Sequence, residues 1–343
     1  MSDEYQQFEQ RKADHIALAL MHQNQASEQN RLDTVHLIHE ALPNLNFDAL
    51  DISSTRLGQF VEKPFIVSSM TAGHADAESL NRALISACAT TGWAMGVGSQ
   101  RRELTDAKAA RVWETLRQDY PAVVLYGNLG IAQLITTPVD VVIQLIHNLK
   151  ATALIIHCNP LQECIQPEGT PTFLGCWDAL AALCEASPVP IILKETGCGF
   201  SKSTLQRLNQ TGLAVVDVSG LGGTHWGRIE GHRAPDESML KQAAETFKNW
   251  GIDTVQSVQN AVAVSEQFEV WGSGGVRHGL DAAKLFALGA TTVGFAKPML
   301  EAALQSSDAV VKAMQLIEYE LRVALFCTGS ACLSDLREKY VVK

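Results

Sequence analysis

The sequence has no excess of basic residues and no long apolar run, and both absences exclude large classes of function. Lys and Arg number 27 against 37 Asp and Glu, which gives a formal net charge of −10. Such a chain has no overall field to attract nucleic acid or an anionic membrane, so a bound phosphate would need local donors. No stretch approaches the ~18 apolar residues of a membrane span, and the polar start MSDEYQQFEQRKADH is not typical of a secretory signal. We expect a cytoplasmic protein with no nucleic-acid or membrane partner.

The eight cysteines form no CxxC pair, the spacing typical of zinc sites and redox motifs. A chain of 343 residues can bury a large core, so it does not need disulfide bonds to fold. We therefore expect free, mostly buried thiols and no zinc site.

From Pro64 onward, short apolar runs alternate with stretches long enough for amphipathic helices. Each run is apolar on both faces and is followed by Gly, Asn or Ser, as is typical of buried parallel strands. The eight predicted strands are 64–68, 94–98, 123–128, 153–158, 191–195, 214–219, 269–273 and 292–296. Eight such units predict an α/β protein with a (β/α)8 TIM barrel. The alternative, an open doubly wound sheet, lacks an early GxGxxG after its first strand.

The two ends of the chain extend this barrel. Residues 1–60 are expected to form an N-terminal arm that packs on the barrel, with a helix over Phe8–Met21. Residues 61–343 would form the barrel with a C-terminal helical tail over 298–327. A barrel with a protruding arm and tail favours a homo-oligomer.

Glycine-rich turns follow the last two strands, where TIM barrels commonly bind phosphate. GSGGVRHG follows the seventh strand and GFAKP the eighth. Glycines let backbone N–H groups converge on an anion, and a following helix adds its dipole. We expect donors from Gly274, Gly275 and the start of the helix GLDAAKL, facing Ala296 and Lys297. The alternative is a pair of tight turns with no ligand.

Lys194 lies within an otherwise apolar strand. A buried ammonium group needs an anionic or hydrogen-bonding partner. A flavin can supply one, because the N1/C2 carbonyl end of its ring gains negative charge on reduction. The alternative is a structural ion pair with Glu195 or Glu230.

A dense group of polar residues follows the fourth strand. Glu163 could hold a hard cation such as Mg²⁺ together with substrate phosphate oxygens, and Gln162 and His157 could bind substrate or move a proton. Arg101 follows the second strand and is expected to point at the mouth of the barrel. Arg11 and Lys12 could capture a diphosphate, or could belong to a solvated helix face.

Taken together, these segments resemble the type 2, FMN-dependent isopentenyl-diphosphate isomerase family. The resemblance covers nearly the whole chain, and its specific motifs are the N-terminal RK, NPLQE followed by QPEG, and SGLGGTHW. It implies reversible allylic isomerisation of isopentenyl and dimethylallyl diphosphate, with FMN, Mg²⁺ and NADPH as the reductant. Reduced FMN would be the main acid and base, and the substrate is a small-molecule diphosphate.

The resemblance also implies roles for individual residues. Gln162 and His157 would be catalytic, and Glu163 would bind the metal. The substrate-binding residues would be Arg11, Lys12, Ser99, Gln100, Arg101, Asn159 and Gln162. The residues holding FMN would be Ser69, Met70, Thr71, Ser99, Asn128, Lys194, Ser219, Thr224, Gly274, Gly275, Ala296 and Lys297. The chain departs from the family at Ala72, Cys158 and Thr170, and none of these changes removes a functional group.

Three rivals use similar features. A 2-hydroxy-acid oxidase or glutamate synthase type of FMN oxidoreductase shares the barrel, but such oxidases need a His base with paired arginines. An inosine-monophosphate dehydrogenase type needs a catalytic cysteine loop, which Cys158, Cys198 and Cys327 do not provide. A non-catalytic flavin or phosphate sensor would have little use for the acid, base and metal-binding groups.

Overall fold

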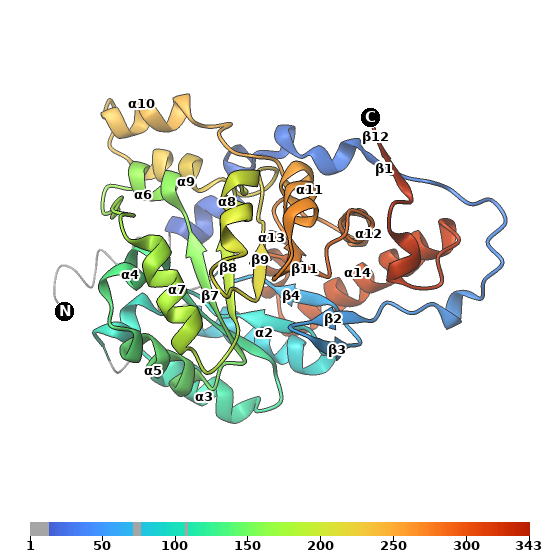
Figure 1. Cartoon of the computed structure of the whole chain (residues 1–343), viewed down its shortest axis with the longest axis horizontal. Coiled ribbons are helices and arrows are strands. Elements are labelled where there is room, and N and C mark those ends of the chain that lie inside the picture. The colour runs from blue at the N-terminus through green and yellow to red at the C-terminus, as the bar shows by residue number, and fades with distance from the viewer. Residues whose placement is uncertain (1–13, 71–76, 107–108) are drawn as a thin grey trace.

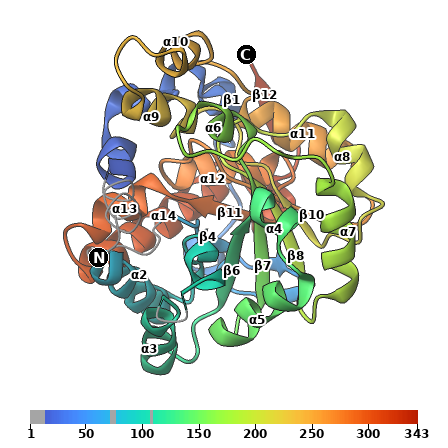
Figure 2. The ribbon, with the colours of Figure 1, turned by 90° about the vertical axis from the view of Figure 1, so that its left-hand side faces the viewer.

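A closed barrel of eight parallel strands forms the centre of the molecule (Figures 1 and 2). The computed structural model describes residues 14–70, 77–106 and 109–343. Around the barrel the strands follow the order β10-β11-β4-β5-β6-β7-β8-β9. Their bounds are β4 Phe65–Val67, β5 Ala94–Gly96, β6 Leu125–Gly130, β7 Ala153–Cys158, β8 Ile191–Glu195, β9 Val215–Asp217, β10 Glu269–Gly272 and β11 Thr292–Phe295. The predicted barrel is confirmed at all eight strands, which excludes the open sheet.

The helices surround the barrel, and α14 completes the ring by packing against both α12 and α2. Their bounds are α2 Ala77–Thr91, α3 Arg111–Asp119, α4 Ile131–Thr136, α5 Val139–Leu149, α6 Pro160–Ile165, α7 Cys176–Ala186, α8 Lys202–Leu208, α9 Trp226–Arg233, α10 Met239–Thr246, α11 Thr254–Val264, α12 Gly279–Ala287, α13 Lys297–Ala303 and α14 Ser307–Cys327. Within the described ranges, no helix is long and apolar enough to cross a membrane.

The predicted C-terminal helical tail consists of two helices, α13 and α14. α13 ends at Ala303, and Ser306 begins α14 by accepting a hydrogen bond from the N–H of Ala309. A serine in extended conformation at this position is a typical N-cap, which satisfies a donor that the new helix leaves unpaired.

The N-terminal arm contains more structure than the single helix that was predicted. Residues 14–20 are helical, and the part of that prediction over 8–13 lies outside the described residues. Short 3₁₀ turns follow at His22–Asn24, Ser27–Gln29, Arg31–Thr34 and Phe47–Ala49, and others occur later in the chain at Gln100–Leu104 and Leu333–Leu336. The N-terminal segment lies beside α9 in both views (Figures 1 and 2).

Two small antiparallel sheets were not predicted. β1 (Val35–Leu37) pairs with β12 (Tyr340–Val342), which joins the arm to the C-terminal end of the chain. β2 (Ser54–Arg56) and β3 (Gln59–Val61) form a hairpin. Its turn donates two backbone N–H groups to Glu269, the first residue of β10, so the hairpin covers the amino end of the barrel.

The register of the barrel places one row of functional residues around its carboxyl rim. Gly130 pairs with His157, His157 with Lys194, and Lys194 with Asp217. Four neighbouring strands, β6 to β9, therefore present these residues at the same height. The active sites of TIM barrels lie at this end of the strands.

Candidate active site

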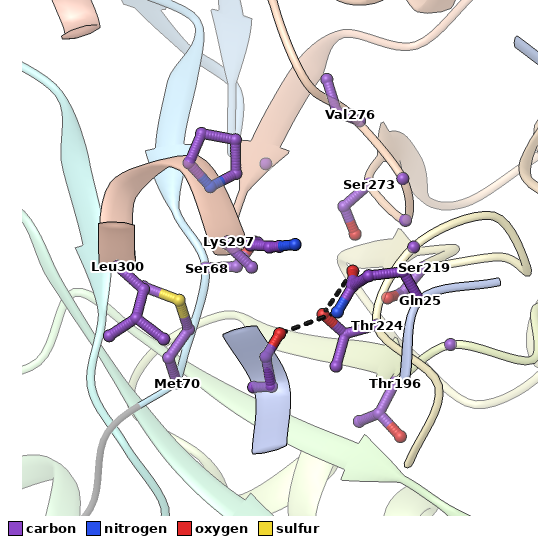
Figure 3. A pocket seen from close by; sticks show the side chains of 18 of the residues that line it. Gln25, Ser68, Met70, Thr196, Ser219, Thr224, Ser273, Val276, Lys297 and Leu300 are labelled. Atoms are coloured by element: carbon purple, nitrogen blue, oxygen red, sulfur yellow. Dashed lines mark hydrogen bonds between the residues drawn. The ribbon is translucent and has the colours of Figure 1, made fainter. Parts of the chain in front are cut away.

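Two adjoining cavities lie at the carboxyl rim of the barrel. The larger, of about 400 Å³, lies between the arm, the loops after β9 and β10, and the start of α13 (Figure 3). The smaller, of about 130 Å³, lies among the residues that follow β5, β6 and β7. The residues that line both cavities are His15, Ser69, Met70, Lys194, Thr196 and Trp226. The two spaces are therefore neighbours across one shared wall.

Four glycines form a wall of the larger cavity, which we call the glycine wall: Gly222, Gly223, Gly274 and Gly275. Gly274 and Gly275 have φ values of 96° and 74°, a region that favours glycine. A Cβ on Gly275 would lie 2.5 Å from the carbonyl oxygen of Gly222, and one on Gly223 would lie 2.6 Å from the nitrogen of Gly275. The two loops therefore meet backbone to backbone, which only glycine permits.

Polar groups without partners point to a ligand in this cavity. The buried hydroxyl oxygens of Ser68 and Ser69 have no hydrogen-bond partner in the described structure. Buried polar groups are normally paired, so these hydroxyls suit a ligand that carries polar atoms. Together with the glycine wall, they fit a flavin nucleotide.

The prediction that backbone N–H groups at the start of α12 donate to a ligand in this cavity is wrong. The N–H of Gly279 donates to Glu320 of α14 at 2.6 Å, and the N–H of Asp281 donates to the Nδ1 of His278 at 3.1 Å. These donors at the start of α12 are thus used within the protein. Ala296 and Lys297, at the start of α13, do line the larger cavity as predicted.

Lys194 lies in the shared wall and is held by a partner that was not predicted. Its Nζ donates to Asp217 at 2.6 Å and to Ser273 at 2.8 Å, and Ser273 in turn donates to Asp217 at 2.5 Å. Lys194 and Asp217 are both buried. Neither Glu195 nor Glu230 is the partner, because strand register places Asp217 of β9 directly beside Lys194 of β8.

Glu195 instead organises the loop that follows β8. One of its oxygens accepts hydrogen bonds from the backbone N–H groups of Thr196, Gly197, Cys198 and Gly199. Burial raises the pKa of Glu195 to about 7, although these four donors act in the opposite direction. The carboxyl group thereby holds Thr196 and Gly197 in the lining of the larger cavity.

The smaller cavity holds the polar cluster, defined as His157, Asn159, Gln162 and Glu163. The Nδ2 of Asn159 donates to Gln162 at 2.9 Å and to Glu163 at 3.0 Å. The Nδ1 of His157 donates to Asn128 at 2.8 Å. The structure thus brings these four residues together, as the sequence indicated, and adds Asn128, which was predicted to hold FMN.

The polar cluster has groups that suit a hard cation. Glu163 is buried and accepts a hydrogen bond from the N–H of Thr170 at 2.6 Å, and the Oδ1 of Asn159 has no partner among the described residues. Mg²⁺ commonly takes one or two carboxylates and completes its shell with water and substrate phosphate. One carboxylate beside an unpaired amide oxygen fits that pattern, and no group of three or more candidate ligands occurs in the described part of the chain.

Glu230 is the functional candidate that sequence reasoning did not assign. It is fully buried, receives a hydrogen bond from Gln162 at 2.8 Å, and contacts His15 at 2.9 Å and Arg233 at 2.6 Å. Burial alone would raise its pKa, but the hydrogen bonds from His15, Gln162 and Arg233 hold the pKa below its usual value. Its place three residues before Arg233 on α9 was the available signal, since that spacing predicts an ion pair.

The remaining predicted residues fall into four groups. Ser219, Thr224, Gly274 and Gly275 line the larger cavity, whereas Ser99, Arg101 and Asn128 line the smaller one. Gln100 lies outside both linings: it is buried, accepts a hydrogen bond from the N–H of Asn128 at 3.0 Å and donates to Glu103 at 3.1 Å. Arg11, Lys12 and Thr71 lie outside the described residues.

Comparison with known proteins shows close relatives along the whole chain. The isopentenyl-diphosphate delta-isomerase of Legionella pneumophila (strain Lens) is 65% identical over 339 residues, 99% of each chain. The protein of the same name from Bdellovibrio bacteriovorus is 50% identical over 347 residues and covers both chains completely. Residues 152–343, more than half of the chain, also match the family model described as FMN-dependent dehydrogenase.

The chain belongs to the type 2, FMN-dependent isopentenyl-diphosphate isomerase family.

Solved structures of flavoenzymes share the fold of this isomerase-family chain at low sequence identity. A mandelate oxidase variant with a monooxide FMN adduct is 18% identical, with a TM-score of 0.66 over 94% of this chain and 92% of the other. A flavocytochrome b2 variant with bound pyruvate is 17% identical, with a TM-score of 0.69 over 97% and 82%. At this identity the likeness concerns the barrel alone and does not support an oxidase reaction.

Proposed function

We propose that the chain catalyses the reversible 1,3-allylic isomerisation of isopentenyl diphosphate and dimethylallyl diphosphate, with reduced FMN as the main acid and base. The observation that carries this proposal is the shared wall. It separates a cavity bounded by the glycine wall from a cavity bounded by the polar cluster. Lys194 and Met70 line both spaces, so a cofactor in one and a substrate in the other would be neighbours there. This arrangement suits a reaction between a flavin ring and an alkene.

The larger cavity is the proposed FMN site. Backbone groups of the glycine wall would hold its phosphate, and Ser69, with Ser68 beside it, offers unpaired hydroxyls. Bound FMN, once reduced by NADPH, supplies an electron-rich ring that can take up and return protons. Lys194, fixed by Asp217, would place positive charge beside that ring. The proposed FMN residues that line this cavity are Ser69, Met70, Lys194, Ser219, Thr224, Gly274, Gly275, Ala296 and Lys297. Ser99 and Asn128, which line the smaller cavity, and Thr71, which lies outside the described residues, are proposed to hold FMN by family resemblance.

The smaller cavity is the proposed substrate site. Ser99, Arg101, Asn159 and Gln162 line it and would bind the diphosphate substrate, while Gln100 would act through Asn128. Gln162 and His157 are the proposed catalytic residues. Asn128 accepts from the Nδ1 of His157, so that ring is held with its Nδ1 protonated. Arg11 and Lys12 remain substrate-binding residues by family resemblance.

Protonating an alkene requires a dry and well-positioned acid. Binding of the diphosphate at the remote end would hold the alkene in place, so that binding energy is used for orientation. His15 of the arm lines both cavities and is buried, so the described part of the arm covers its own chain's site and helps to exclude water.

The decisive experiment is a labelled turnover assay. FMN-loaded protein reduced with NADPH is incubated with isopentenyl diphosphate in heavy water, and the products are followed by NMR. We expect deuterium-labelled dimethylallyl diphosphate with no net oxidation of NADPH per turnover. Equal turnover with oxidised FMN, under strict exclusion of reductant, would contradict the role of the reduced flavin.

The Mg²⁺ assignment has its own test. Glu163→Gln removes the buried carboxylate from the polar cluster, so the Mg²⁺ concentration for half-maximal activity should rise about tenfold or more, while FMN binding is unchanged. Glu185→Gln, which removes an exposed carboxylate from α7, is the matched control and should leave both unchanged. Loss of FMN from Glu163→Gln would contradict the separation of the two sites.

We also propose that the protein is a cytoplasmic homo-oligomer, with residues 1–60 as an arm on the barrel of 61–343. All eight cysteines are free, as is typical of a reducing compartment. Light scattering coupled to gel filtration would show a mass that is a multiple of 37.2 kDa, and a monomer would contradict the oligomer.

A further inference from the structure

The arm forms part of the larger cavity through a short segment that we call the strap, residues 22–30. The strap runs beside the loop that follows β9, where Gln25 and Thr224 form an antiparallel bridge. Next to this bridge, the backbone N–H of Ala26 donates to the carbonyl oxygen of Gly223 at 2.7 Å. The strap is thus joined by main-chain hydrogen bonds to the glycine wall.

The strap also contacts the second loop of the glycine wall. The Nδ2 of Asn30 donates to the carbonyl oxygen of Gly275 at 2.8 Å. A Cβ on Gly275 would lie 2.9 Å from this same amide nitrogen, and one on Gly222 would lie 3.2 Å from the Cα of Asn30. The strap therefore packs directly against both glycine loops, with little room for a side chain at Gly222 or Gly275.

The side chain of Gln25 connects this wall to the arm helix over residues 14–20. Its Nε2 donates to the carbonyl oxygen of Ala19 in that helix at 2.7 Å, and its Oε1 accepts from the Oγ1 of Thr224 at 3.3 Å (Figure 3). Gln25 is 5% exposed, and Gln25, Ala19 and Thr224 all line the larger cavity. One amide thus joins a cofactor-site residue to the helix that covers the site.

We propose that Gln25 is a positioning residue that couples FMN binding to the docking of the arm helix. A ligand that binds only when the strap and helix are docked stabilises that arrangement by mass action. The coupling is reciprocal: FMN favours the docked helix by the same factor by which docking strengthens FMN binding, so a change that weakens docking also weakens FMN binding. The inference rests on the proposed function only in placing FMN in the larger cavity.

The test compares Gln25→Ala with Gln23→Ala in the full-length protein. Gln23 lies on the same strap, but its side chain is exposed, contacts His232 and does not line the larger cavity. FMN affinity is measured by quenching of flavin fluorescence on the apoprotein. Gln25→Ala removes the hydrogen bonds to Ala19 and from Thr224 and should raise the Kd for FMN about 3- to 10-fold, whereas Gln23→Ala should match the wild type.

A second readout reports the coupling itself. Chymotrypsin cleavage after Leu18 or Leu20 is followed by mass spectrometry with and without FMN. In the wild type FMN should slow this cleavage several-fold, and in Gln25→Ala the ratio of the two rates should fall toward one. A residue that merely stabilised the fold would change both rates and leave their ratio intact.

Two results would overturn the proposal. One is wild-type FMN affinity in a folded Gln25→Ala protein, and the other is an unchanged protection ratio. If Gln25→Ala does not fold, Gln25→Glu replaces it, since the carboxylate keeps the acceptor for Thr224 but cannot donate to Ala19. That variant must also lose FMN-dependent protection. Protein that binds FMN with this coupling but does not isomerise the diphosphate would overturn only the proposed function.

Discussion

The glycine wall and the polar cluster line two neighbouring cavities and are built on different principles. In the glycine wall, two loops meet through their backbones, and the closest approaches leave no room for a Cβ at Gly223 or Gly275. In the polar cluster, the contacts are side-chain hydrogen bonds, such as those of Gln162 with Asn159 and Glu230. The glycine wall therefore depends on close backbone packing, and the polar cluster depends on the functional groups of its side chains.

This difference predicts how each region responds to substitution. A side chain added to the glycine wall displaces backbone, so cofactor binding is lost as a whole. A change in the polar cluster replaces one functional group and leaves the wall intact, so FMN is retained while turnover or stability changes. A substitution that breaks the buried ion pair in the shared wall should lower the free energy of unfolding of the protein.

The largest effect is expected from Gly274→Ala. Its Cβ would lie 2.6 Å from the nitrogen of Gly220 and 2.8 Å from the hydroxyl of Thr254, at a φ of +96°. Left-handed strain and overpacking each cost about 1–3 kcal/mol. We expect FMN affinity to fall about 100-fold or more, measured by fluorescence titration.

The matched control is Gly58→Ala in the β2–β3 hairpin. Gly58 has a φ of +71°, and its Cβ would meet nothing within 4 Å. This variant carries the backbone strain without the clash and lies at the other end of the barrel. It should bind FMN as the wild type does, and a comparable loss of FMN would contradict the argument from close backbone packing.

Asp217→Asn in the shared wall should have the next largest effect. It leaves the buried Lys194 ammonium without a compensating charge. Removing one partner of a buried ion pair costs about 3–5 kcal/mol, and we expect about 3 kcal/mol because Asn can still accept a hydrogen bond. Denaturant unfolding of the apoprotein measures this. Asp119→Asn, which breaks the exposed pair with Arg82, should leave the unfolding free energy close to that of the wild type.

The smallest effect concerns pH and the buried Glu230. The pKa of Glu230 in the folded protein lies below that of an unfolded glutamate, so its contacts stabilise the protein fully above the unfolded pKa, and the contribution is lost as pH falls through the folded pKa. Glu230→Gln should flatten the decline in unfolding free energy between about pH 5 and pH 3, with FMN still bound at neutral pH. Glu185→Gln should keep the wild-type slope, and the same slope in Glu230→Gln would contradict the argument.

The barrel was predictable because its signals are local. Each strand is a short apolar run with a turn residue after it, and the rule that active sites lie at the carboxyl rim then locates Lys194 and the polar cluster. The β1–β12 sheet was not predictable in the same way, since Val35–Leu37 and Tyr340–Val342 are distant in the chain. The strap was missed for a similar reason, because nothing near Gln25 in the sequence indicates that it faces Thr224.

The amino-acid sequence by itself determined the order of strands, the glycine turns and the kinds of functional groups at the rim, since periodicity and turn chemistry depend on neighbouring residues. Only the tertiary structure decided the partners: Asp217 for Lys194, Glu230 for Gln162, and α14 rather than a ligand for the start of α12. A hydrogen bond or an ion pair forms only between groups a few ångströms apart. Strand register and helix packing set those distances across the whole chain.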